Sequence, residues 1–168
     1  MLSSTNESKL LIGTDVDFAM PLGNYSDVNG IGGGVLLTAE YPLVGIVDQL
    51  SATARVGFQF HADKDLGAGT SEHVHSIPVL LGAKYYLQSD RQGLFGTAEL
   101  GLFDLMAGAD LGGGVSASDN SLKFGMGVGV GYAYEKWSAR VNIHSHDVGN
   151  FGDAMMITAG IGYQFAAF

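Results

Sequence analysis

The chain has 168 residues, 26 of them glycine, a formal net charge of −9 and no cysteine. These values exclude a disulfide framework and thiolate chemistry, and the acidic balance argues against nucleic acid as a partner. Only 15% of the residues are charged, against about 25% in a typical soluble domain, so much of the surface is predicted to avoid water. No apolar run approaches the roughly 20 residues of a spanning helix, which leaves a closed barrel as the membrane-spanning form.

Residues 1–8 are polar and contain no apolar segment of the signal-peptide kind. We expect a disordered tail over 1–8 and a single domain over 9–168. Since an exported protein needs a signal peptide, we interpret the chain as a mature form from which that signal has been removed.

Eight segments alternate between apolar and polar residues, the period-two pattern of β-strands with two different faces. They are 10–20, 31–41, 49–60, 75–87, 94–103, 122–132, 138–144 and 158–165. Pro78 falls inside the fourth segment and removes a ladder hydrogen bond, so we expect a bulge there or a position near the rim.

The connections alternate in length. Those at 23–29, 62–72, 109–120 and 147–153 are long and polar, and those at 41–48, 88–92 and 135–136 are shorter. Long loops at one end and tight turns at the other are typical of an up-and-down membrane barrel. An even number of strands places both termini at the short-turn end.

Alternation alone does not separate a membrane barrel from a soluble lipocalin-like barrel, because both have one apolar and one polar face. The sixth segment favours the membrane barrel, because its alternate glycines suit a crowded interior, and the glycine–tryptophan signature of lipocalins is absent near the N-terminus. The charges of the polar face also nearly balance, as a buried set must. This predicted interior ion network is Asp15, Asp17, Glu40, Arg55, Lys84, Glu99, Lys123 and Arg140.

Short turns make the second and third segments neighbours, and likewise the fourth and fifth, so ion pairs are predicted between them. The expected partners are Glu40–Arg55 and Lys84–Glu99, with Arg140 reaching across to Asp15 or Asp17 and Lys123 nearer the outer rim. Eight strands leave an interior only just wide enough for side chains, so we expect a plugged barrel.

Aromatic residues of the apolar face gather at the segment ends, which indicates two girdles at the membrane interfaces. The girdle at the short-turn end is predicted to be Tyr41, Tyr85, Tyr132, Tyr134, Trp137, Tyr163 and Phe165. Phe18, Phe58 and Phe60 lie near the long-loop ends.

Three stretches carry a family resemblance: SIPVLLGAKYYL, GMGVGVGYAY and the closing TAGIGYQF. With them, the chain from about residue 10 to 165 resembles the small outer-membrane barrels of the OmpA/OmpX type. The resemblance implies an all-β fold, an eight-stranded antiparallel up-and-down transmembrane β-barrel in the bacterial outer membrane. It also implies that Thr158, Gly160, Tyr163 and Phe165 form the signal read by the barrel-assembly machinery. The family motif ends at the last aromatic, whereas Ala166, Ala167 and Phe168 follow here.

The resemblance specifies architecture more than activity. We expect a structural or surface-interaction protein, without an open pore, catalysis or cofactor, that is monomeric and contacts membrane lipid and lipopolysaccharide. Two alternatives are a soluble lipocalin-like carrier of a small ligand and a lipid A deacylase-like enzyme. His144 and Ser145 lie where such deacylases carry a His-x-Ser-Asn motif, but the nucleophile does not align, because position 146 is His.

All five histidines fall at long-loop ends: His61, His73, His75, His144 and His146. Imidazoles gathered in this way could bind Zn²⁺ or Cu²⁺, although solvated loop histidines are the favoured interpretation. The long loops are also acidic, with Asp27, Asp63, Asp65, Glu72, Asp110, Asp119, Asp147 and Asp153. These carboxylates serve solubility or bridge through divalent cations to lipopolysaccharide phosphates.

Overall fold

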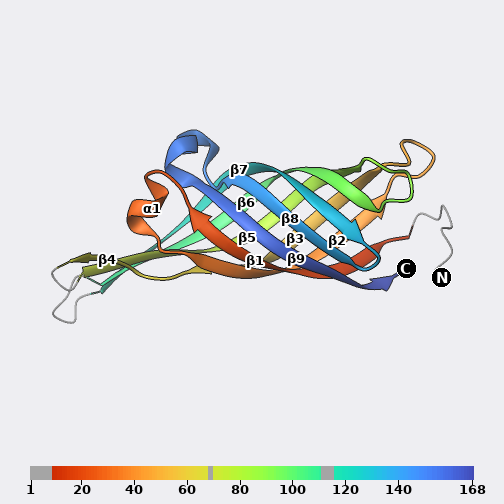
Figure 1. Cartoon of the computed structure of the whole chain (residues 1–168). Coiled ribbons are helices and arrows are strands. Elements are labelled where there is room, and N and C mark those ends of the chain that lie inside the picture. Colours follow the sequence, from red (N-terminus) through yellow and green to blue (C-terminus); the bar gives the residue numbers. More distant parts are fainter. Residues whose placement is uncertain (1–8, 68–69, 111–115) are drawn as a thin grey trace.

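The computed structural model of the chain describes residues 9–67, 70–110 and 116–168, which form an elongated β-barrel (Figure 1). Its strands are β1 (Leu11–Pro21), β2 (Gly32–Pro42), β3 (Leu50–His61), β4 (Lys64–Gly67), β5 (Thr70–Tyr86), β6 (Gly93–Asp110), β7 (Ser116–Tyr134), β8 (Trp137–Ser145) and β9 (Met155–Ala167). Two short helices, α1 (Tyr25–Val28) and the 3₁₀ helix η1 (Val148–Ala154), lie at the end opposite the C-terminus. The expected tail at 1–8 lies outside the described residues.

Every strand pairs antiparallel with its neighbours, and a pairing between β3 and β5 closes the wall. β4 pairs only with the outer part of β5, so the closed wall contains eight strands. The predicted antiparallel up-and-down barrel is therefore confirmed. No helix of the described residues is long and apolar enough to cross a membrane.

The first described residues and the C-terminus lie together at the end where the short turns lie, here called the terminal end; the opposite end is the loop end (Figure 1). Leu10 and Phe168 exchange backbone hydrogen bonds of 3.0 Å across β1 and β9. Ala166 and Ala167 pair with Ile12 and Leu11. Ala166 and Ala167 thus continue the closing strand beyond Phe165, and Phe168 follows as its hydrogen-bonded end.

Strands β5, β6 and β7 are longer than their sequence patterns predict. The β6–β7 ladder runs without interruption from Gly93↔Ala133 to Asp110↔Ser116. Much of the predicted loops 62–72 and 109–120 is therefore strand. Alternation fails to mark this region, because a sheet that projects beyond the barrel does not have one buried face along its whole length.

The expectation of a bulge or rim position at Pro78 is wrong. Pro78 is buried in the body of β5, and the β5–β6 register passes through Pro78↔Phe103 without a shift. Because proline has no backbone N–H, Pro78 instead interrupts the pairing of β5 with β3, on the other side of the strand. The β3–β5 ladder has pairs at Val56↔Val79 and Gln59↔Ser76 but none between them.

The barrel has an apolar exterior and a polar interior. Val16, Leu37 and Val130 on the outer face are 57–67% exposed, whereas Asp15 and Arg55 on the inner face are at most 5% exposed. This inverts the usual burial rule of soluble proteins and is what a lipid-facing wall requires, since lipid rather than water covers the apolar face.

The glycines of β7 leave room for large inward-facing side chains on the neighbouring strands. A Cβ atom at Gly125 would fall 2.5 Å from the Phe103 ring, and one at Gly127 would fall 2.6 Å from the His144 Cβ. A Cβ atom at Gly131 would likewise overlap the Phe95 ring. These glycines therefore let inward-facing side chains of β6 and β8 lie close to the β7 backbone.

Candidate functional site

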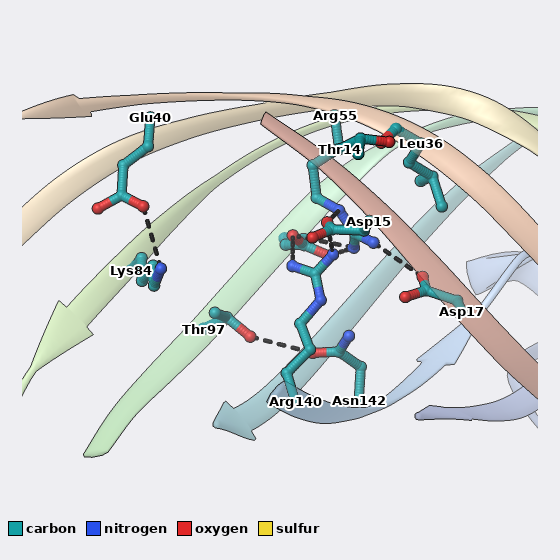
Figure 2. Close-up of polar contacts among 11 residues, drawn as sticks. Thr14, Asp15, Asp17, Leu36, Glu40, Arg55, Lys84, Thr97, Arg140 and Asn142 are labelled. Atoms are coloured by element: carbon teal, nitrogen blue, oxygen red, sulfur yellow. Dashed lines mark hydrogen bonds and ion pairs between the residues drawn. The ribbon is translucent and has the colours of Figure 1, made fainter. Parts of the chain in front are cut away.

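The middle of the barrel holds a buried network of charged side chains centred on Arg55 (Figure 2). The guanidinium of Arg55 lies 2.9 Å from an Asp17 carboxylate oxygen, 3.0 Å from Glu99 and 3.2 Å from Asp15. Arg140 crosses from β8 and pairs with Asp15, and a second nitrogen lies 3.9 Å from Glu99. Two arginines thus share three carboxylates from β1 and β6, which compensates the cost of burying them.

A second ion pair lies nearer the terminal end. Lys84 donates to Glu40 at 3.0 Å, and the Tyr86 hydroxyl donates to the other Glu40 oxygen at 2.9 Å. The Lys84 ammonium also lies 4.2 Å from the centre of the Phe95 ring, within cation–π range. Every described charge of the interior therefore has an opposite partner.

The predicted pairs Glu40–Arg55 and Lys84–Glu99 are wrong, although the predicted contact of Arg140 with Asp15 is present. The neighbouring strands were predicted correctly, but the height of each side chain along the barrel axis was not. Arg55 lies opposite Thr38, and Glu40 lies opposite Thr53, one step nearer the terminal end. Arg55 extends instead across the lumen to β1 and β6, which leaves Glu40 for Lys84.

Small cavities remain inside the described part of the wall. One of about 40 Å³ lies beside Glu40, Arg55 and Arg140, and one of about 110 Å³ lies near the turns of the terminal end, lined in part by Lys84 and Trp137. Both exceed the roughly 10–15 Å³ that a single water molecule needs.

At the loop end, α1 places the ring of Tyr25 into the mouth of the barrel. Tyr25 is 5% exposed and lies edge-on to His61 and His146, with ring centroids 6.0 and 5.5 Å away. Its hydroxyl lies 3.3 Å from the His146 Nδ1, and His146 stacks on Phe103 at 4.2 Å. Burial raises the pKa of the Tyr25 phenol and lowers that of the His146 imidazole, so both are neutral near pH 7.

The interpretation of the histidines as solvated loop residues is wrong for three of the five. His61, His144 and His146 are at most 5% exposed. Sequence position placed them correctly at strand ends, but the cover supplied by Tyr25 was not visible. His73 and His75 are only partly buried; they stack at 4.5 Å, and His73 lies 2.9 Å from Asp63. Within the described residues, no three His, Asp or Glu side chains are placed to hold a metal ion.

Ser145, the residue of the deacylase alternative, is fully buried and fixes the adjacent loop. Its hydroxyl lies 3.0 and 3.1 Å from the carbonyl oxygens of Asp147 and Phe151. The same oxygen accepts from the Asp147 backbone N–H at 3.3 Å. A hydroxyl held in this way by the backbone is not presented to a substrate.

The remaining predicted residues lie on the wall and at its ends. Lys123 pairs with Asp147 at 2.9 Å near the loop end, and this contact lowers the pKa of Asp147. Thr158 and Gly160 face the interior, where a Cβ at Gly160 would overlap the Asp17 carboxylate. The predicted girdle residues lie outside and near the terminal end: Tyr41, Tyr85, Tyr132, Tyr134, Trp137 and Phe165 are 44–62% exposed, and Tyr163 packs against Trp137 at 4.7 Å. The side chains of Asp65 and Asp110 lie outside the described part.

A closed wall of eight antiparallel strands, apolar outside and ion-paired inside, defines a membrane-spanning β-barrel. The sequence model of the family "outer membrane protein beta-barrel domain" matches residues 2–165, and the chain belongs to this family. Its place is therefore the outer membrane.

Solved structures share the fold at low sequence identity. Ail, the attachment invasion locus protein of Yersinia pestis, is 13% identical with a TM-score of 0.65, covering 95% of this chain and 99% of its own. A second Ail structure holds the heparin analogue sucrose octasulfate. Neisserial surface protein A is 18% identical (TM-score 0.55; 93% and 97% covered), and the N-terminal barrel of Pseudomonas aeruginosa OprF is 14% identical (0.58; 95% and 100%). No curated protein sequence matches the chain.

Proposed function

We propose that this protein is a non-catalytic outer-membrane barrel with a closed interior, whose loop end contacts partners at the cell surface. The observation that carries the proposal is the Arg55 network. An arginine bonded to Asp15, Asp17 and Glu99 occupies the lumen at mid-height, and an eight-stranded wall leaves little space around it. We therefore expect solutes to find no continuous aqueous path through the described wall.

The test is conductance of the folded protein in a planar lipid bilayer. The unmutated protein is expected to be electrically silent over hours of recording. A steady, large conductance in the unmutated barrel would refute the closed interior. Boiled and unboiled samples on a detergent gel, which migrate differently when the barrel is folded, verify that folded protein was tested.

The sheet formed by the outer parts of β5, β6 and β7 supports the surface-interaction half of the proposal. β8 ends at Ser145, opposite Met126, whereas β7 continues outward to Ser116. Among the described residues, no strand pairs with this outer part of β7 on the side away from β6. Its unpaired backbone groups can accept an extended peptide as an added strand.

The charge of the loop end bears on which partner binds. Asp27, Asp63, Asp119 and Asp153 are exposed there. Heparin, whose analogue sucrose octasulfate is held in an Ail structure, would meet net repulsion, so we expect this protein not to bind it at physiological salt. Retention of the folded protein on immobilised heparin would contradict this.

The rival function is lipid A hydrolysis. Incubating the refolded barrel with lipopolysaccharide and searching for released acyl chains by mass spectrometry separates the two. We expect no release, because Ser145 is held by backbone carbonyls. Release that His144→Ala abolishes would overturn the proposal.

A further inference from the structure

We propose that His61, His144 and Met156 form a binding site for a soft monovalent metal ion, copper(I), in the loop-end mouth of the barrel. The three side chains come from β3, β8 and β9 and are 2%, 5% and 0% exposed. They lie beneath Tyr25, between the aromatic cover and the central ion network.

The first observation is a contact between two groups that both lack a proton. His61 Nδ1 lies 2.9 Å from the carbonyl oxygen of Val74, which can only accept, so Nδ1 carries the imidazole proton. His61 Nε2 is then an unprotonated lone pair. It faces the Met156 sulfur at 3.2 Å, and a thioether has no hydrogen to donate. Two buried lone pairs facing each other are stabilised by a cation between them.

The third donor is placed by the strand register. His144 pairs directly with Met156 across β8 and β9, and directly paired residues have Cβ atoms about 4.5–5.5 Å apart. Both side chains point into the barrel. The His144 Nε2 atom is buried and has no hydrogen-bond partner in the described part of the chain. A metal ion bound to His61 and Met156 would satisfy this nitrogen as well.

The donor chemistry selects the ion. A thioether and two imidazoles are soft or borderline ligands, and thioether sulfur favours Cu⁺ over Zn²⁺. All three donors are neutral, so a divalent ion would bring two uncompensated charges into a buried site, whereas a monovalent ion brings one. His146 is close by, with its ring 5.3 Å from that of His144, but no three His, Asp or Glu side chains of the described residues are placed to hold one metal ion, which also disfavours zinc.

A bound ion would join strands that are not neighbours in the wall. β2 and β1 separate β3 from β9, so the ion would connect opposite sides of the mouth. Because the unfolded chain does not bring these donors together, the folded state would be favoured. At an ion concentration 100 times Kd, the ratio of folded to unfolded protein rises about 100-fold.

The experiment uses the full folded chain in lipid nanodiscs with Ag⁺, a redox-inert analogue of Cu⁺, in chloride-free buffer, and repeats it with Cu⁺ under ascorbate. We expect one ion per chain by equilibrium dialysis. The ¹⁵N signal of His61 Nε2 and the methyl signal of Met156 should shift on saturation. Zn²⁺ at the same concentration should leave both signals unchanged; a stronger response to Zn²⁺ would overturn the choice of ion.

Variants locate the site. Met156→Leu keeps the side-chain volume but removes the sulfur. It should weaken Ag⁺ binding by about 100-fold, because even residues that only support a metal ligand contribute up to about that factor to affinity. Met155→Leu, the adjacent residue on the other face of β9, is the matched control and should bind as the unmutated protein does. Unchanged binding by Met156→Leu would refute the site.

The partly exposed pair His73 and His75 is the competing location. His73→Gln should retain full Ag⁺ binding, and loss of binding in this variant would move the site outside the barrel and overturn the proposal. Heat-dependent gel migration shows whether each variant folds. If Met156→Leu does not fold, the site is tested on the unmutated protein alone. An unshifted Met156 methyl signal at Ag⁺ saturation then refutes the site.

Discussion

The middle of the barrel and its loop-end mouth are both buried and polar, yet they are stabilised in different ways. In the middle, Arg55 contacts three carboxylates at 2.9–3.2 Å, so charges compensate one another. In the mouth, Tyr25, His146 and Phe103 pack ring against ring, and the Nε2 atoms of His144 and His146 have no partner in the described part of the chain.

The difference follows from what covers each region. The middle is enclosed by strands alone, so its charged side chains are paired across the lumen. The mouth is also covered by α1, whose Tyr25 ring packs against His61 and His146. Buried atoms without a partner occur in both regions, Asn142 Nδ2 among them in the middle, so the mouth is distinguished by the type of these atoms: imidazole nitrogens beside a thioether.

Replacing the central cation should give the largest effect. Arg55→Met removes the ion-pair partner of Asp17 and leaves Arg140 to pair with Asp15 and Glu99, so it should reduce the free energy of unfolding by about 3–5 kcal/mol. Urea unfolding of the refolded barrel measures it. Lys136→Met, in the exposed turn between β7 and β8, is the control and should change stability by less than about 0.5 kcal/mol. Equal effects in the two variants would show that the network does not stabilise the middle.

A smaller loss is expected from overpacking the closing strand. Gly160→Ala places a Cβ against the Asp17 carboxylate and should cost about 1–3 kcal/mol. Gly96→Ala is the matched control, because its Cβ would have one neighbouring atom, 3.9 Å away. The same urea assay compares them. A neutral Gly160→Ala would mean that Gly160 is dispensable for interior packing.

In the mouth, removing a single hydroxyl should have a modest and local effect. Tyr25→Phe keeps the ring but loses the contact with His146 Nδ1, at a cost of about 0.5–1.5 kcal/mol. Hydrogen exchange should increase at α1 and η1 while the backbone around Arg55 stays protected. Faster exchange in the middle would contradict the separation of the two regions.

The smallest effect is expected at the rim, where Lys123 pairs with Asp147. The lysine side chain is 38% exposed, so the pair should contribute only about 0.2–1 kcal/mol. Since the pKa of Asp147 is lowered in the folded protein, this contribution is complete above the ordinary value of 3.8 and is lost as the pH falls through the lower folded-state pKa. The stability difference between the unmutated protein and Asp147→Asn should therefore vanish in strong acid. A difference that grows on acidification would contradict this pairing.

Several features of the site were accessible from the sequence and others were not. The glycine row of β7 and the balanced charges indicated a crowded, polar interior. The partners of Glu40 and Arg55 were assigned wrongly, because a long side chain in a staggered barrel reaches a level that strand adjacency does not specify. The burial of His61 and His146 was missed because it depends on Tyr25, which lies at least 36 residues away in the chain.

The sequence by itself determined the strands, their order, their antiparallel connection and which face meets lipid, because a period of two fixes side-chain direction locally along each strand. Tertiary structure decided the ion-pair partners, the projection of β5–β7 beyond the wall and the meeting of His61, His144 and Met156. These depend on shear between strands and on how loops fold back over the mouth. Both are long-range properties that no local pattern of residues encodes.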